Sequence, residues 1–392
     1  MTLTEPQLPA SFVAFKGTSP LTGAELWTVV TADYEPHAEA AGFLQSLRAA
    51  DASANTQRAY AGRVALYLRY CESAGLDWAT PRLHHLSQYM QWLVETPIAR
   101  QGRGNASQPR YRSKGTANAH MTAVVEFLRH AAIATDRVPE SVVKQLSEPR
   151  HLAHLPPGFD TGEDGSYRTI RARAIKFRVA VEGYEWLTPD QIDALIDSAR
   201  HARDRFLIYL LAVTGMRIGE ALGLRREDMH FLSSSTMFGC REKGPHVHVR
   251  RRLNSNGALA KTRTPRAIPV SEPVADYYAE YQRERDSVPE ASSSDLVFVN
   301  LFHAPLGQPM RYASTKENFD RLAKRAGFPA RPHMLRHSAI TQWAQDDVPR
   351  DVIQSLAGHV SPQSMTPYIH TSDEAKRAAI ESVASKFKRP QL

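Results

Sequence analysis

The sequence has few of the features that are typical of secreted proteins, of proteins with structural metal sites or of membrane-spanning proteins. Only two of its 392 residues are cysteines, Cys71 and Cys240, and they lie far apart without a metal-type spacing. This scarcity argues against a disulfide framework and against zinc, and it fits a reducing cytoplasm. No run of about 18 apolar residues is present, so we expect no membrane-spanning helix. The first residues also lack the charged and apolar segments of a signal peptide. We therefore expect a soluble, cytoplasmic protein.

Basic residues outnumber acidic ones. The sequence contains 49 lysine and arginine residues against 41 aspartate and glutamate residues, a formal net charge of +8. This surplus favours a polyanionic partner, with nucleic acid first and an acidic membrane surface second. A merely basic soluble protein has the same balance, so charge alone leaves both interpretations open. At this length we expect two or three domains, each large enough to bury a core.

Hydrophobic periodicity separates three regions in the first half of the chain. Residues 1–36 show weak periodicity with several prolines and glycines, which predicts a short, partly ordered N-terminal arm. Residues 37–150 contain four helical stripes with no strand between them, which predicts a small all-α domain. Residues 151–185 contain structure-breaking prolines and glycines followed by basic residues, which is typical of a basic linker.

The segment 186–392 combines helices with a small group of strands. Its start, Thr188-Pro189-Asp190-Gln191, has the pattern of a capping box with proline at the first helical position. Strands are expected at His246–Leu253, Arg266–Val270 and Leu296–Asn300, and the first two can pair around a turn region. We therefore expect a mainly α fold with a small β-sheet, in which an all-helical domain precedes a mixed α+β domain.

Two stretches of the chain are strongly basic. The loop 99–114 carries five cations and no acid, so it is either a solvated tip or a finger that contacts phosphates. The end of the predicted linker adds further cations. The candidate DNA-contacting residues are Arg100, Arg103, Arg110, Arg112, Lys114, Arg171, Arg173 and Lys176.

Several residues of the last domain could together carry phosphoryl transfer. Arg217 and Arg336 have the planar fork that can hold two phosphate oxygens, although either alone could be an ordinary paired arginine. Glu220, three residues after Arg217, could hold its guanidinium or simply be exposed. Tyr368 is a weak nucleophile unless nearby cations lower its pKa, and it would form a covalent phosphotyrosine. Lys261 follows a predicted hairpin turn and could act as a general acid.

Four histidines near the C-terminus raise the alternative of a metal site. His333 and His337 have the i, i+4 spacing that places two imidazoles on one helix face, and His359 and His370 follow. No glutamate stands at the H-E-x-x-H position and no cysteine lies nearby. We therefore expect no metal ligands here, and we expect no cofactor.

Six residues resemble, in order and spacing, the functional residues of the tyrosine recombinase (phage integrase) family: Arg217, Lys261, His333, Arg336, His359 and Tyr368. The local strings are similar as well, namely T-G-M-R-I-G-E-A-L-G-L, H-M-L-R-H-S, L-A-G-H and T-P-Y-I-H. The resemblance is strong over about residues 186–370. It is weaker over 37–146, where S-A-N-T-Q-R-A-Y and the later helices resemble the family's helical core-binding (SAM-like) domain.

This resemblance implies a C-shaped clamp around double-stranded DNA and a chemistry that needs neither ATP nor metal. Tyr368 would attack the scissile phosphate to give a 3′-phosphotyrosyl link and a free 5′-hydroxyl. Arg217 and Arg336 would brace the phosphate, and His359 would donate to it. Lys261 would protonate the departing 5′-oxygen, His333 would assist proton transfer, and Glu220 would be a supporting residue.

The resemblance also implies a homotetramer that acts on paired sites through a Holliday junction, associated with the nucleoid when on DNA. Accessory DNA-bending or transposition proteins are further expected partners. The short arm and the basic loop are more similar to transposon-borne or standalone members than to many phage integrases. Ile380, Val383, Ala384 and Phe387 form one apolar face of a predicted C-terminal helix, which would dock in cis or on a neighbouring protomer.

Some points stay open. The hairpin before Lys261 is longer than in many members of the family, so Lys243 is a candidate substitute. A type IB topoisomerase shares the same chemistry, and a DNA-binding regulator with an idle site or a metal-dependent nuclease would be other classes of protein. The target site, the crossover spacing and the choice among integration, excision, transposition and dimer resolution do not follow from the residues.

Overall fold

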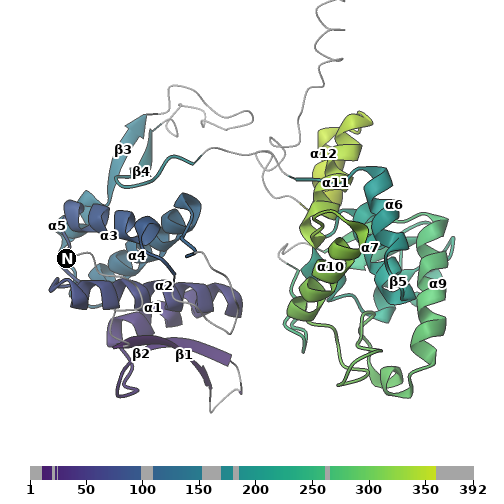
Figure 1. Cartoon of the computed structure of the whole chain (residues 1–392), viewed down its shortest axis with the longest axis horizontal. Helices are drawn as coiled ribbons and strands as arrows, with labels where there is room; N and C mark the ends of the chain where they lie inside the picture. The colour runs from purple at the N-terminus through teal and green to yellow at the C-terminus, as the bar shows by residue number, and fades with distance from the viewer. Residues whose placement is uncertain are drawn as a thin grey trace, which may run out of the picture. The chain divides into compact units, whose positions relative to one another are not determined.

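The computed structural model describes residues 11–19, 23, 25–98, 109–151, 169–179, 185–260 and 265–358. The chain divides into two compact units, Met1–Val181 and Glu182–Leu392 (Figure 1). Each unit buries its own hydrophobic clusters. Within the described ranges, no helix has both the length and the apolar character needed to cross a membrane.

The N-terminal unit is built mainly from helices. They are α1 (Ala38–Ala49), α2 (Ala54–Ser73), α3 (Leu83–Glu95), α4 (Lys114–Ala134) and the short α5 (Glu140–Gln145). Two of them begin at a serine whose side chain accepts a hydrogen bond from the third backbone N–H beyond it: Ser53 before α2 and Ser113 before α4. The four helices predicted for this region are confirmed, with no strand between them.

The segment expected to be a partly ordered arm contains a β-hairpin, which corrects the prediction for residues 12–31. Strands β1 (Phe12–Thr18) and β2 (Glu25–Thr31) pair antiparallel, with Phe12 opposite Thr31. Val29 is fully buried and packs with Phe43 and Leu44 of α1 in one cluster. The hairpin is ordered because its apolar face covers helices α1 and α2, a long-range contact that local periodicity does not reveal.

The predicted linker also needs correction in its last part. Strand β3 (Ser147–His151) pairs antiparallel with β4 (Thr169–Arg173). Beyond β4, the side-chain amide of Asn118 in α4 donates to the carbonyl of Phe177 at 3.0 Å and accepts from its N–H at 2.9 Å. Residues 169–177 therefore belong to the N-terminal unit, because these hydrogen bonds satisfy their backbone.

The C-terminal unit packs around one helix, α7 (Ala202–Thr214), most of whose residues are buried. Its helices are α6 (Pro189–Asp197), α7 (Ala202–Thr214), α8 (Ile218–Ala221), α9 (Glu272–Asp286), α10 (Tyr312–Ala326), α11 (Pro332–Gln345) and α12 (Arg350–Ala357). The capping box at the start of α6 is confirmed, since Thr188 Oγ1 accepts from Gln191 N at 3.3 Å and Gln191 Oε1 accepts from Thr188 N at 3.0 Å. Helix α7 packs against α9 and α11, so it lies at the centre of this core.

A three-stranded antiparallel sheet in the order β5-β6-β7 completes this unit. Its strands are β5 (Met229–His230), β6 (His246–Val249) and β7 (Arg266–Pro269), so the predicted pairing of the segments around 246 and 266 is confirmed. The strand expected at Leu296–Asn300 was wrong. This segment makes two isolated antiparallel bridges, Leu296 with Arg225 and Val299 with Pro309, and no continuous strand. The guanidinium of Arg285 donates to the carbonyls of Leu296 and Val297, both at 2.7 Å.

Candidate active site

The end of α7 lies directly against α11. Gly215 ends α7 with a φ of +59°, and a Cβ at this position would lie 3.0 Å from the Trp343 ring and 3.3 Å from Ala339 Cβ. Glycine therefore permits both the left-handed conformation and the close approach of the two helices. This contact brings the segment that holds Arg217 next to the helix that holds Arg336.

Arg336 joins three segments of the C-terminal unit. Its side chain is buried, with a relative exposure of 2%. One terminal nitrogen donates to the Gly215 carbonyl at 2.6 Å, and the other donates to the Ala357 carbonyl at the end of α12 at 2.8 Å. A buried guanidinium is tolerable when carbonyls accept its N–H groups, and the two bonds fix the plane of its fork.

Glu220 holds Arg217 through both its backbone and its side chain. The Glu220 carboxylate is completely buried, and it accepts from Arg217 N at 2.9 Å and from an Arg217 terminal nitrogen at 3.1 Å. The Arg217 side chain keeps 23% of its surface exposed. The sequence left open whether Glu220 holds the Arg217 guanidinium or is simply exposed. In the structure its carboxylate is buried and holds the guanidinium.

Arg266 in β7 is a member of the site that the sequence prediction missed. Its terminal nitrogens donate to Glu220 at 2.8 and 3.3 Å, and its Nε donates to the Leu356 carbonyl at 3.0 Å. Leu356 precedes Ala357, the acceptor of Arg336. The set of Arg217, Glu220, Arg266 and Arg336 therefore forms one connected group, the arginine network. The only feature of the sequence that pointed to Arg266 was its place as a basic residue at the start of the predicted strand that follows Lys261.

Glu220 is ionised in this setting. Burial opposes its charge, but the hydrogen bonds and positive charges of Arg266 and Arg217 outweigh that effect, and the pKa of Glu220 lies below its ordinary value. One carboxylate among three guanidinium groups leaves a net positive site. Such a site suits an anion that approaches the exposed side of Arg217.

The hairpin that leads to Lys261 is anchored on α8. A Cβ on Gly219 would lie 3.1 Å from the Leu259 carbonyl oxygen, and a Cβ on Gly223 would lie 2.8 Å from the Asn254 side chain. Asn256 donates to the Leu222 carbonyl at 3.0 Å. The two glycines therefore allow the chain before residue 261 to lie on the helix that follows Arg217.

Three of the predicted functional residues, Lys261, His359 and Tyr368, lie outside the described residues. His333 is described: it is exposed in the first turn of α11, and its ring centroid lies 4.4 Å from that of the buried His337. His333 thus shares a helix with Arg336 and faces solvent. Within the described part of the chain, neither histidine belongs to a group of three or more metal-ligand side chains.

The structure brings part of the two basic stretches together in the N-terminal unit. Lys114 Nζ lies 5.9 Å from the centroid of the Phe177 ring, next to Lys176. Arg110, Lys114 and Lys176 are exposed and Arg112 is partly buried, and we call these four residues the basic patch. Arg173 donates to Thr122 Oγ1 in α4 at 2.5 Å, a contact that also anchors β4. Arg171 lies in β4 opposite Pro149, and Arg100 and Arg103 fall outside the described residues.

Two family models match the chain. The model described as "Phage integrase family" matches residues 185–375, and the one described as "Phage integrase, N-terminal SAM-like domain" matches residues 40–131. The chain is 26% identical over 351 residues to Transposase A from transposon Tn554 of Staphylococcus aureus, covering 89% of this chain and 91% of that protein. It is 23% identical over 274 residues to the tyrosine recombinase XerC of Chlamydia trachomatis serovar D, covering 68% and 70%.

Solved structures share the fold. The integrase of transposon Tn1549 in complex with circular intermediate DNA has a TM-score of 0.57 at 17% identity, over 86% of this chain and 97% of that one. A lambda integrase dimer bound to a COC′ core site has a TM-score of 0.54 at 13% identity, over 86% and 96%. The expected mainly helical fold with a small β-sheet in the second unit is confirmed. The first unit, expected to be all-helical, also contains the hairpins β1-β2 and β3-β4.

Proposed function

This chain belongs to the phage integrase family and is a tyrosine site-specific recombinase, and we propose that it cleaves and rejoins double-stranded DNA through a 3′-phosphotyrosyl intermediate at Tyr368. The relatives named for transposition and recombination support integration, excision or transposition of a mobile element as its task.

The observation that carries this proposal is the arginine network. Arg217 and Arg336 come from distant segments, yet Glu220, Arg266 and two helix ends hold them in one connected group. Preorganised donors of this kind stabilise the charge that develops on a phosphate without reorganising during the reaction. The network therefore supports the assignment of both arginines to the scissile phosphate.

The remaining groups complete a metal-free reaction. Tyr368 attacks phosphorus, His359 donates to a phosphate oxygen, and Lys261 protonates the 5′-oxygen that leaves. His333 assists the transfer of the tyrosine proton. The anchored hairpin supports Lys261 as the general acid, because Lys261 directly follows the segment that rests on α8. Lys243 lies instead in the loop before β6, where its backbone forms a bridge with Ser234.

The N-terminal unit supplies a second contact to DNA. The basic patch places cations that can neutralise backbone phosphates, and both units together would close as a C-shaped clamp around the duplex. Four protomers would act on two sites and exchange strands through a Holliday junction. Accessory DNA-bending or transposition proteins would select the biological outcome.

Covalent trapping on DNA tests the proposal. Labelled fragments that flank the gene, nicked near candidate junctions, would be incubated with the protein in EDTA and resolved on a denaturing gel. We expect a shifted band with the wild type and with Tyr312→Phe, a matched change of an exposed tyrosine, and none with Tyr368→Phe. Cleavage by Tyr368→Phe would overturn the mechanism.

Three further outcomes separate the competing classes. Relaxation of any supercoiled DNA by a monomer, without a paired site, would favour a type IB topoisomerase. Loss of cleavage in EDTA would favour a metal-dependent nuclease. Unchanged biological function in Tyr368→Phe would identify a DNA-binding regulator whose catalytic site is idle.

A further inference from the structure

A second cluster of functional side chains lies on the three-stranded sheet. His230 of β5 is the direct partner of His246 in β6. His248 follows two residues later in β6, so its side chain emerges on the same face of the sheet. The ring of His230 stacks on that of His246 at 4.8 Å and 8°, and meets the ring of His248 edge-on at 4.9 Å. The register of the sheet therefore gathers three imidazoles.

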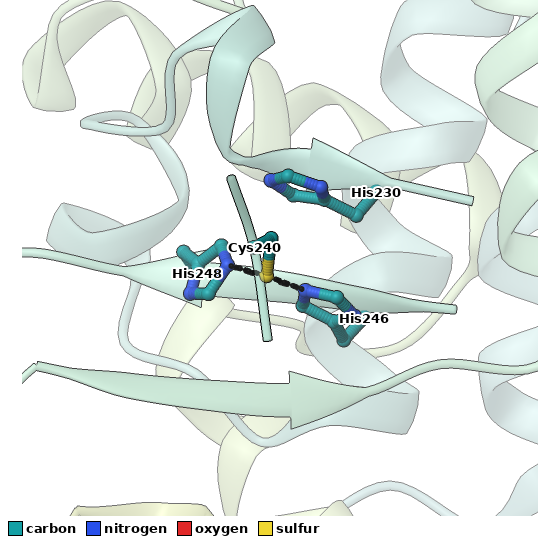
Figure 2. A group of neighbouring side chains, drawn as sticks. All are labelled: His230, Cys240, His246 and His248. Atoms are coloured by element: carbon teal, nitrogen blue, oxygen red, sulfur yellow. Dashed lines mark hydrogen bonds between the residues drawn. The ribbon is translucent and has the colours of Figure 1, made fainter. Parts of the chain in front are cut away.

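The loop between β5 and β6 adds a thiol to these imidazoles. Gly239 has a φ of +77°, and the N–H of Cys240 donates back to the Ser235 carbonyl at 3.2 Å. This turn places Cys240 Sγ 3.3 Å from His246 Nε2 and 3.2 Å from His248 Nε2. Figure 2 shows the sulfur between the rings of His246 and His248, with the ring of His230 beside them.

The spacing of these atoms fits a tetrahedral metal ion. His246 Nε2 and His248 Nε2 lie 3.2 Å apart, so the sulfur and the two nitrogens form a nearly equilateral triangle. An ion with Zn–N bonds of about 2.05 Å and Zn–S bonds of about 2.3 Å requires N···N edges of about 3.3 Å and N···S edges of about 3.6 Å. All four candidate ligand atoms lie within 4.8 Å of one another, so the longest separation belongs to His230. The His230 side chain would therefore have to move toward the other three ligands when an ion binds.

Neighbouring groups prepare the imidazoles for a cation. His246 Nδ1 donates to the Gly244 carbonyl at 2.7 Å, which directs the lone pair of Nε2 toward the sulfur, as outer partners do in metal sites.

A cavity gives the cluster a route to solvent. It has a volume of about 430 Å³, and its lining includes His230, Phe238, Cys240 and Arg250. Arg250 lies 3.6 Å from the buried carboxylate of Asp228, which offsets part of its positive charge near a bound cation. An ion could therefore enter and leave without unfolding the sheet.

We propose that His230, Cys240, His246 and His248, the Cys–His cluster, bind one divalent transition metal ion of the zinc type. Thiolate and imidazole are ligands that such ions prefer, and four protein ligands make a closed, structural site. The ion fastens the loop 231–245 to the sheet and takes no part in DNA cleavage. This replaces the expectation that zinc is absent, which rested on the scarcity of cysteines and on their spacing along the chain.

Cobalt titration of the full-length protein, without a histidine tag, tests the proposal. Protein stripped by a chelator under reducing conditions would be titrated with Co²⁺ in the absence of DNA. We expect one equivalent to give the visible bands of a tetrahedral site and a thiolate-to-cobalt charge-transfer band, and Zn²⁺ to displace it. Saturation without the charge-transfer band would overturn the proposal, because it would mean that the thiol is not a ligand.

Matched variants locate the site. Cys240→Ser should abolish the charge-transfer band, and His248→Gln should weaken Co²⁺ binding by at least the roughly 10–100-fold that loss of an outer partner costs. Cys71→Ser, in the N-terminal unit, and His303→Gln, at an exposed histidine, should leave the titration unchanged. Equal binding by Cys240→Ser and wild type would also overturn the proposal.

X-ray absorption of the zinc-loaded wild type keeps the test independent of how the variants fold. We expect one sulfur and three nitrogen neighbours, and a shell of oxygen and nitrogen alone would contradict the assignment. Because these experiments use no DNA, their failure would leave the proposed recombinase chemistry untouched. Failure of covalent trapping would equally leave the metal site standing.

Discussion

The arginine network and the Cys–His cluster draw on different strands of one small sheet. Arg266 of the network begins the edge strand β7, whereas the cluster takes His230 from the other edge strand, β5, and His246 and His248 from the central strand β6. The network gathers permanently charged donors around one carboxylate and suits an anion. The cluster gathers neutral soft bases and suits a cation. The comparison teaches that one scaffold can present opposite chemistries when strand register decides which side chains meet.

Removal of Arg336 should have the largest effect. Arg336→Ala removes a proposed phosphate donor and leaves the carbonyls of Gly215 and Ala357 without this partner. We expect covalent cleavage to fall at least about 10²–10³-fold, the cost of one oxyanion donor. The rate of phosphotyrosine formation on a suicide substrate measures it. Arg331→Ala, an exposed arginine at the start of the same helix, is the control, and equal rates for both variants would contradict the assignment.

Neutralising Glu220 should destabilise the network itself. Glu220→Gln leaves Arg217 and Arg266 without the buried charge that both contact, and we expect a loss of about 3 kcal/mol in the free energy of unfolding. Urea unfolding followed by circular dichroism measures the change. Glu227→Gln, at an exposed partner of Arg252, should cost far less. A loss in Glu220→Gln no larger than in that control would show that the buried carboxylate does not hold the network together.

Zinc should stabilise the cluster without affecting the network. At a free Zn²⁺ concentration of about 100 times the dissociation constant, we expect about 2.7 kcal/mol of added stability in the wild type and none in Cys240→Ser. Cleavage by Cys240→Ser should stay close to that of wild type, because Cys240 lies in the loop between β5 and β6 and makes no contact with the arginine network. Chemical denaturation with and without Zn²⁺, beside suicide-substrate kinetics, separates the two effects. A large kinetic defect in a folded variant would show that the two regions are coupled.

Acidification should reduce the contribution of Glu220 to the stability of the arginine network. The folded-state pKa of Glu220 lies below the ordinary value of 4.5, so its contribution is fully present above that pH and is lost as the pH falls through the folded pKa. The stability difference between wild type and Glu220→Gln should therefore shrink on acidification below about pH 4.5. Unfolding curves of both proteins over this range measure the shrinkage. A constant difference would mean that the carboxylate does not titrate with folding.

The basic patch should give the smallest effect. Lys114→Ala removes one candidate phosphate contact, which should weaken DNA binding a few-fold and reduce the slope of log affinity against log salt by about 1. Fluorescence anisotropy at several salt concentrations measures both quantities. Lys144→Ala, an exposed lysine of the same unit that pairs with Glu140, should leave the slope unchanged. Equal slopes for both variants and wild type would remove Lys114 from the interface.

Long periodic segments were predictable because their burial repeats locally. The stripe Met121, Val124, Val125 and Leu128 is buried in α4 as expected. The hairpin at 12–31 was missed because its order depends on helices beyond it in the sequence. The third strand was predicted wrongly because apolar β-branched residues also fill a buried extended segment whose carbonyls bond to Arg285.

The sequence by itself indicated the family, the helical segments and the choice of Arg217 and Arg336 as candidate site residues, because these rest on local strings and periodic patterns. Only the tertiary structure decided that Arg266 shares Glu220 with Arg217, and that Cys240 meets three histidines. Both groupings depend on strand register and on loops that reverse the chain. The sequence indicated that the segments around 246 and 266 pair, but the register of the whole sheet, which decides which side chains become neighbours, follows only from the folded structure.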